Sequence, residues 1–290
     1  MKMSAHGTMA SAGTGTAAAL RHEIAARNQE YASKNCLAHC LSYGEQPVVC
    51  YEPEAGGHGN FIAASYRAIV NDPEWTLRLQ KVHTQARTSL PRNGRVWREL
   101  DSCNSSDALL MNIFCYPRVF AGGRLRALLG FGEAARPKFG VRARVPLANG
   151  HTDRTEIDMQ LADLLVEAKL TESDFQWRDR NIVEGYRDFA EVFERRELPR
   201  RNHLCGGYQL IRNVLAAHAG GNAFTVLCDA RRQDLREQWY AVLRCVKPLG
   251  LRVRMKMFTW QEVAGALPGP LQRFLEEKYG ITAATGSSHR

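Results

Sequence analysis

Charged residues interrupt two apolar stretches that otherwise have the composition of paired β-strands. Residues 155–172 read TEIDMQLADLLVEAKLTE, with Asp158, Glu167 and Lys169 inside these stretches. Charged side chains are rarely fully buried unless they are paired or bind a metal. The stretch therefore either folds differently from its appearance or holds a ligand that needs those charges.

A hairpin whose two-residue turn is formed by residues 162–163 would bring the acids together. It places Asp158 opposite Glu167, and Glu156 opposite Lys169, on one side of the sheet. Like charges directly opposed on neighbouring strands are destabilising, so two such carboxylates suit a divalent cation such as Mg²⁺, which binds carboxylate oxygens. A lysine beside the cation can orient an attacking water, help to deprotonate it, or stabilise charge on a phosphate. The alternative is a half-solvated sheet face with weak cross-strand ion pairs.

Beyond residue 100, helical and strand patterns alternate. The expected helices are residues 105–116, 178–196, 206–221, 233–246 and 260–279, and the expected strands besides the hairpin are 139–148, 223–230 and 251–260. This order predicts an α/β fold with a mixed central sheet flanked by helices.

The N-terminal third has a different composition. Residues 20–43 and 60–89 favour helices, which predicts a helical N-terminal region over 19–98. We expect residues 1–18 and 281–290 to be disordered tails. The chain lacks a signal-peptide pattern and any run of ~20 apolar residues, so we expect a cytoplasmic protein that does not enter a membrane.

Eight cysteines raise the possibility of a thiol-bound metal. Cys36, Cys40 and Cys50 lie close in sequence, and Cys205 is a further candidate ligand, which makes a zinc or iron–sulfur protein one alternative. No second CxxC-like pair completes four ligands at a known spacing. The simpler interpretation places Cys36 and Cys40 on one helix as small packed side chains.

The net charge of +9 and the pI of about 9.3 favour a polyanionic partner, above all nucleic acid. Arg231, Arg232 and the arginines of residues 194–202 are candidates for phosphate contact. Such charge runs are usually solvated surface.

Three sequence motifs together resemble a known family. An acid followed by Glu-x-Lys on an apolar strand resembles the PD-(D/E)xK nuclease superfamily, which has the restriction-endonuclease-like fold. SSDALLMNIF at 105–114 and GGYQLIRN at 206–213 are similar to the SSQ-A-x-x-x-N-x-F and YQLxRN helices of a poorly characterised bacterial branch. The resemblance spans roughly residues 100–260 and implies a nuclease-like domain over 99–280.

The resemblance implies hydrolysis of phosphodiester bonds with Mg²⁺ or Mn²⁺, in DNA rather than RNA, by a chain that could act as a homodimer. Asp158, Glu167 and the backbone carbonyl of Ala168 would bind the metal. Lys169 would be the catalytic lysine, and Gln209 would lie beside the site.

Further residues follow from the flanking motifs. Possible additional site residues are Glu99, Ser106, Asp107, Asn112 and Glu156, and possible nucleic-acid contacts are Tyr208, Arg212 and Asn213. Ser106 and Asp107 equally suit a plain helix N-terminus, and Asn112 equally suits a hydrogen bond within the core. The sequence departs from the pattern in two places, with Ile157 where a proline is usual and Asp107 where the branch has glutamine.

A binding module on the same fold, without hydrolysis, is the main alternative function.

Overall fold

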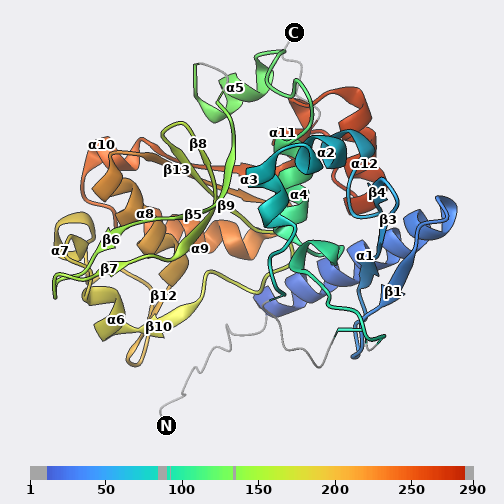
Figure 1. Ribbon diagram of the computed structural model, residues 1–290. Coiled ribbons are helices and arrows are strands. Elements are labelled where there is room, and N and C mark those ends of the chain that lie inside the picture. Colours follow the sequence, from blue (N-terminus) through green and yellow to red (C-terminus); the bar gives the residue numbers. More distant parts are fainter. Residues whose placement is uncertain (1–11, 84–89, 92, 133–134, 285–290) are drawn as a thin grey trace, which may run out of the picture.

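The computed structural model describes residues 12–83, 90–91, 93–132 and 135–284 (Figure 1). In these residues a five-stranded sheet has the strand order β14-β13-β9-β8-β5. The strands are β5 (Lys138–Arg142), β8 (Glu156–Leu161), β9 (Leu164–Ala168), β13 (Ala223–Cys228) and β14 (Met255–Thr259). β13 is parallel to β9 and β14, whereas β8 is antiparallel to β9 and β5. The expected mixed sheet is confirmed.

The hairpin β8–β9 has the predicted register. Met159 pairs with Val166, and Leu161 pairs with Leu164, so residues 162–163 form the turn. Ala162 adopts a left-handed backbone conformation with φ 49° to close it. β9 lies in the middle of the sheet, and all five of its residues are buried.

Helices cover both faces of the sheet (Figure 1). One apolar core contains Met159 and Val166 of the sheet. Its helices are α1 (Ala12–Lys34), α4 (Ser106–Phe114), α11 (Trp260–Gly265) and α12 (Gly269–Tyr279). The opposite core contains Leu165 and Val226 with α8 (Tyr208–Gly220) and α9 (Gln233–Leu243). The alternation of Leu165 and Val166 between the two cores is the period of two of a strand.

Shorter elements complete the described chain. The helices are α2 (Ala63–Val70), α3 (Pro73–Arg78), the 3-10 helix η2 (Glu99–Asp101), α5 (Arg124–Leu129), α6 (Arg180–Glu184), α7 (Phe189–Val192) and α10 (Leu249–Arg252). The strands are β1 (His39–Leu41), β2 (Val49–Tyr51), β3 (Pro53–Glu54), β4 (Gly57–His58), β6 (Val145–Pro146), β7 (Thr152–Asp153), β10 (Trp177–Asp179), β11 (Arg200–Arg201) and β12 (Leu204–Gly206). No helix within the described ranges has the length and hydropathy needed to span a bilayer.

Several expected helices were wrong in extent. The helix expected over 60–89 consists of α2 and α3, with no helix over 79–83, and the helix expected over 260–279 is divided into α11 and α12. The N-terminal region expected to be helical also contains the strands β1 to β4. α1 ends at Lys34, where Cys36 takes a left-handed conformation, and Cys40 belongs to β1 instead. Cys36 and Cys40 therefore do not share a helix. The helix expected over 178–196 is divided into β10, α6 and α7, because α6 ends at Gly185 and the following residues form a turn. The strand expected over 139–148 is likewise divided into β5 and β6.

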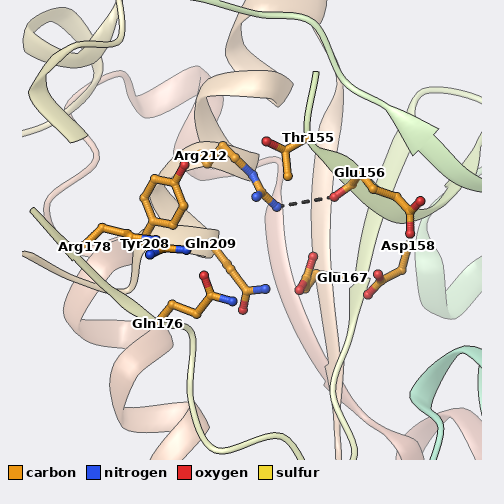
Figure 2. A pocket seen from close by; sticks show the side chains of 9 residues that line it. All are labelled: Thr155, Glu156, Asp158, Glu167, Gln176, Arg178, Tyr208, Gln209 and Arg212. Atoms are coloured by element: carbon orange, nitrogen blue, oxygen red, sulfur yellow. Dashed lines mark hydrogen bonds between the residues drawn. The ribbon is translucent and has the colours of Figure 1, made fainter. Parts of the chain in front are cut away.

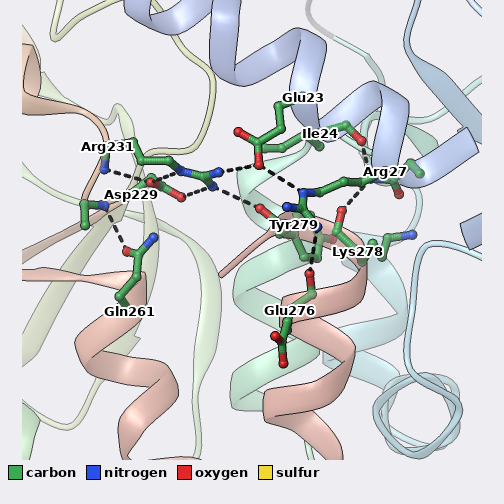
Figure 3. A network of polar contacts seen from close by, with 11 residues as sticks. Glu23, Ile24, Arg27, Asp229, Arg231, Gln261, Glu276, Lys278 and Tyr279 are labelled. Carbon is green, nitrogen blue, oxygen red and sulfur yellow. Dashed lines mark hydrogen bonds and ion pairs between the residues drawn. The ribbon is translucent and has the colours of Figure 1, made fainter. Parts of the chain in front are cut away.

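The N-terminal helix is bound to the body of the protein by polar contacts (Figure 3). Arg231 donates to Glu23 of α1 (2.7 Å), to Asp229 (2.7 Å) and to the carbonyl of Tyr279 (3.0 Å). Arg232 is fully buried and pairs with Asp234 at 2.8 Å. Burial therefore excludes Arg232 from phosphate contact, whereas Arg231, with 33% of its side chain exposed, is already paired with two carboxylates.

The segments expected to be tails are partly ordered. α1 begins at Ala12, inside the segment 1–18, and Ile281 is fully buried in the core that contains α12. The remaining residues of these segments, 1–11 and 285–290, lie outside the described residues.

Candidate active site

A polar pocket of about 390 Å³ opens at the carboxyl end of β9 (Figure 2). In Figure 2 the amides of Gln176 and Gln209 lie together on one side of it, facing the carboxylates of Glu167 and Asp158. Its lining comprises Thr155, Glu156, Asp158, Glu167, Gln176, Arg178, Tyr208, Gln209 and Arg212. Four of the residues predicted for the site, Glu156, Asp158, Glu167 and Gln209, thus line this pocket together with the predicted nucleic-acid contacts Tyr208 and Arg212.

Glu167 is held by hydrogen bonds to both of its carboxylate oxygens. Lys169 Nζ lies 2.9 Å from Oε1, and Asn213 Nδ2 donates to Oε2 at 2.8 Å. Only 3% of Glu167 is exposed. Asn213, expected to contact nucleic acid, is fully buried behind the pocket and positions Glu167 instead.

Asp158 faces the same strand end. Its Oδ2 accepts a hydrogen bond from the backbone N–H of Ala168 at 2.8 Å. The next residue, Lys169, donates its N–H to Leu227 of β13 at 2.8 Å. Since the N–H and C=O of one strand residue point to the same side, and those of the next residue to the other, the carbonyl of Ala168 also points toward Asp158.

The electrostatics of the two acids disfavour simultaneous ionisation. Burial, together with nearby Glu167 and Asp107, raises the pKa of Asp158 well above its usual value. A divalent cation between the carboxylates would remove this penalty, because an opposite charge favours the ionised form.

The acidic neighbours of Lys169 determine the direction of its pKa shift. Burial alone would lower the pKa of its ammonium group, but Glu167, Glu172 and Asp158 outweigh that effect, so the pKa is raised above the ordinary lysine value. The carbonyl of Lys169 accepts a hydrogen bond from Trp260 Nε1 at 2.9 Å, which fixes this end of the strand.

The donor set fits a hard divalent cation. No group of three or more His, Cys, Asp and Glu side chains in the described part of the chain is placed to hold a metal ion. The predicted site has two carboxylates and a backbone carbonyl, and such oxygen ligands with added waters are what Mg²⁺ prefers. Asp158, Glu167 and Ala168 are thus the residues that would hold it.

Helix α8 forms one wall of the pocket. Gln209 Oε1 is buried there without a hydrogen-bond partner among the described residues. Arg212 donates to Asn213 Oδ1 at 3.2 and 3.1 Å and to the carbonyl of Glu156 at 3.4 Å. Its guanidinium lies 5.8 Å from the ring centroid of Tyr208. This wall therefore presents two groups to the pocket: the unpaired hydrogen-bond acceptor Gln209 Oε1 and the guanidinium of Arg212.

An ion network adjoins the pocket on the side of α4. Arg78 bonds Asp107 and Glu156, each at 2.8 Å. Lys81 bonds Asp107 at 2.7 Å, Glu99 at 3.0 Å and Glu156 at 3.3 Å. Burial raises the pKa of Glu99. In this network Glu99, Asp107 and Glu156 are occupied by Arg78 and Lys81, and Glu156 does not pair with Lys169 as the hairpin pattern predicted.

A family comparison agrees with this geometry. A family model described as "Restriction Endonuclease associating with ARP" (REase-ARP) matches residues 25–280. The chain belongs to the REase-ARP family. Neither the curated proteins nor the solved structures contain a match to it. Membership places the chain in a restriction-endonuclease-like family, and the match begins within α1, so the REase-ARP region includes the N-terminal helices.

Two other predicted residues of this REase-ARP chain lie outside the pocket. Asn112 is fully buried, and its side chain bonds the backbone of Ile62, Asn60 and Ala108 at 2.8–3.0 Å. Ser106 donates to Glu172 at 2.6 Å in a small neighbouring cavity. Asn112 therefore acts within the core, and Ser106 fixes the loop after β9.

The cysteines do not form a metal centre within the described residues. All eight are free thiols. Cys40 and Cys50 lie opposite each other in the antiparallel register of β1 and β2, without a disulfide between them. Burial raises the pKa of Cys50 to about 12, so its thiol stays protonated. Cys205 lies in the core on the far side of the sheet.

Sequence patterns did not identify five residues around this REase-ARP site. Thr155 precedes β8, Gln176 directly precedes β10, Arg178 belongs to β10, and Arg78 and Lys81 come from the N-terminal region. Sequence spacing could not predict these residues, because tertiary contacts, such as the pairing of β10 with β12, bring them to the site. The left-handed conformation of Gln176, with φ 66°, appears only in the structure.

Proposed function

We propose that this protein is a divalent-metal-dependent nuclease that hydrolyses phosphodiester bonds in DNA at the pocket beside β9. The observation that carries the proposal is the meeting of Asp158, Glu167 and Lys169 at one strand end, next to an open polar pocket. The restriction-endonuclease description of the family supports DNA over RNA as the substrate.

Lys169 has an electrostatic role in this proposal. The carboxylates of Glu167, Glu172 and Asp158 raise the pKa of its ammonium group, against the effect of burial. A cation held beside Glu167 stabilises negative charge that develops on the phosphate. Its ion pair with Glu167, which lines the pocket, fixes the ammonium behind that carboxylate before substrate arrives.

The α8 wall orients the remaining reactants. The unpartnered Gln209 Oε1 is placed to accept a hydrogen bond from the attacking water. Arg212 supplies a cation for a non-bridging phosphate oxygen, since a guanidinium matches phosphate geometry. A bound Mg²⁺ or Mn²⁺ would polarise the phosphate and lower the pKa of water.

The setting of this activity is also proposed. Eight free cysteines support a reducing compartment, the cytoplasm. We also propose that the protein forms a homodimer, which would place one site on each strand of a duplex. Light scattering tests this by measuring the molar mass of the protein in solution.

A cleavage assay tests the function. Wild type, Lys169→Ala and Lys138→Ala are incubated with linear, circular and single-stranded DNA and with RNA, in Mg²⁺, Mn²⁺ or EDTA. Lys138 is an exposed lysine of β5 and serves as the matched control. We expect DNA cleavage that needs the metal, is lost in Lys169→Ala, and is retained in Lys138→Ala.

Two results would contradict the proposal. Cleavage that survives Lys169→Ala would mean that the residues are wrongly assigned or that another nuclease is present. A folded wild type that binds DNA without cutting it, in either metal, would favour the binding module.

A further inference from the structure

A small three-stranded sheet borders the pocket at β10. β10 pairs with β12, and β12 pairs with β11, all antiparallel. Arg178 of β10 and Arg200 of β11 both pair with Cys205 of β12, one on each side. In Figure 1, β10 and β12 lie below the large sheet, and Arg178 of β10 lines the pocket drawn in Figure 2.

Two arginines of this sheet are stacked on aromatic rings. Arg178 lines the pocket, and its guanidinium lies 5.7 Å from the ring centroid of Tyr208. Arg201 lies 4.6 Å from the ring centroid of Trp177. Stacking holds a guanidinium through its flat face and leaves its N–H donors free at the edge.

The indole ring of Trp177 packs against the backbone of the neighbouring strand β12. A Cβ at Gly206, the residue paired with Trp177, would lie only 2.9–3.0 Å from the indole ring. The indole therefore lies against the bare backbone of β12 and needs a glycine there. This close approach fixes the ring on which Arg201 is stacked.

Neither stacked arginine is neutralised. In the described part of the chain, Arg178 and Arg201 form no ion pair with a carboxylate, although both are exposed. Nearby Arg180 and Arg195, by contrast, both pair with Glu184, at 3.3 and 2.7 Å. Two fixed cations without an ion-pair partner, next to the acidic pocket, favour the binding of a polyanion that extends beyond the pocket.

We propose that the sheet β10–β12–β11 binds the DNA backbone next to the scissile phosphate, with Arg178 and Arg201 each contacting a flanking phosphate. This inference rests on the proposed function, because it takes the strand in the pocket to be duplex DNA. Arg178 binds the phosphate nearer the pocket, and Arg201 binds one farther along the same strand.

The test is the salt dependence of binding. A labelled duplex is titrated with wild type, Arg178→Ala, Arg201→Ala and Arg124→Ala in EDTA, which blocks metal-dependent cleavage, at several salt concentrations. Arg124 is an exposed arginine of α5 at the opposite end of the molecule (Figure 1). Each lost phosphate contact lowers the slope of log K against log salt by about 0.9. We expect that decrease in each sheet variant, with several-fold weaker binding, and no change in Arg124→Ala.

The outcomes separate this inference from the proposed hydrolysis. Reduced slopes in both sheet variants support the inference even if wild type fails to cut DNA in Mg²⁺. Unchanged slopes in both, or an equal decrease in Arg124→Ala, overturn it while leaving metal-dependent cleavage intact. Tighter binding of single-stranded DNA or RNA than of duplex would also overturn it, since the inference commits to duplex DNA.

Discussion

Asn213 illustrates how a residue without access to substrate can control the site. Its Nδ2 donates to Glu167, and its Oδ1 accepts from Arg212, so it connects a predicted metal ligand with a predicted phosphate ligand. Removing this amide would leave one oxygen of Glu167 free to rotate away from Asp158.

Replacing this residue tests that role. We expect Asn213→Ala to weaken metal activation by about 10–100-fold, the usual effect of losing a hydrogen bond to a metal ligand. It should also lower the free energy of unfolding by about 1–3 kcal/mol, because a buried acceptor loses its donor. Metal titration of cleavage and thermal melting measure the two effects.

Asn35→Ala is the matched control, since Asn35 is exposed after α1 and bonds only the carbonyl of Tyr31. Loss of stability in Asn213→Ala without any change in the metal concentration needed for half-maximal cleavage would show that Asn213 is purely structural.

The acids could be predicted from the sequence because they belong to one hairpin. The period of two and a two-residue turn are local rules, and they placed Asp158 and Glu167 together. The partners of Glu156 could not be predicted in that way, since Arg78 and Lys81 approach from residues more than seventy positions earlier.

At the scale of the elements, the β8–β9 turn is closed by an unfavourable residue. Ala162 has φ 49°, in a region that costs a residue with a Cβ roughly 1–2 kcal/mol. β9 is buried along its whole length and β8 at every second residue, so the register is retained despite the turn.

We expect Ala162→Gly to raise the free energy of unfolding by up to about 1 kcal/mol, because glycine adopts this conformation without strain. Chemical denaturation measures the change. The control is Ala219→Gly, at an exposed position of α8, where glycine should destabilise by roughly 0.5–1 kcal/mol. Equal destabilisation by both substitutions would show that the turn is not strained.

Element types were predicted well where periodicity was long, and poorly where turns interrupt it. α8 begins and ends within two residues of the predicted range because glycines lie at both ends. The segment 178–196 has helical spacing of its apolar residues, yet β10 pairs with β12, a contact that no local pattern contains.

At the scale of the whole molecule, Lys278 connects the C-terminal helix with the N-terminal region. Its Nζ is fully buried, donates to the carbonyl of Gly59 at 2.9 Å and lies 3.8 Å from the ring centroid of Tyr51. No described carboxylate forms an ion pair with it. Burial therefore lowers the pKa of Lys278 well below the ordinary value.

This lowered pKa sets the sign of a pH effect. Between the folded and unfolded pKa values of Lys278 the unfolded chain binds more protons, so this lysine makes the protein less stable as pH falls. We expect Lys278→Met to raise the free energy of unfolding by about 1–3 kcal/mol at neutral pH, and the gain to shrink as pH rises toward about 10. Denaturation at several pH values measures it.

Lys138→Met, at an exposed position of β5, is the control and should change stability little at any pH. A destabilised Lys278→Met whose deficit does not vary with pH would show that the ammonium is favourably solvated by the surrounding rings.

The N-terminal region is integrated with the predicted nuclease region. Leu20 and Ile24 of α1 share a core with β9, and Arg78 reaches the pocket. Composition predicted a helical region over 19–98 but carried no information on where it packs. The approach of α1 to Arg231 depends on residues more than two hundred positions apart.

The central position of β9 has a consequence for synthesis of the protein. β9 is completed on one side by β13, and the carbonyl at its end is held by Trp260. A ribosome-bound chain that has not yet released these residues lacks the support of its acidic strand end. The proposed site would therefore assemble only after the chain through Trp260 has left the ribosome.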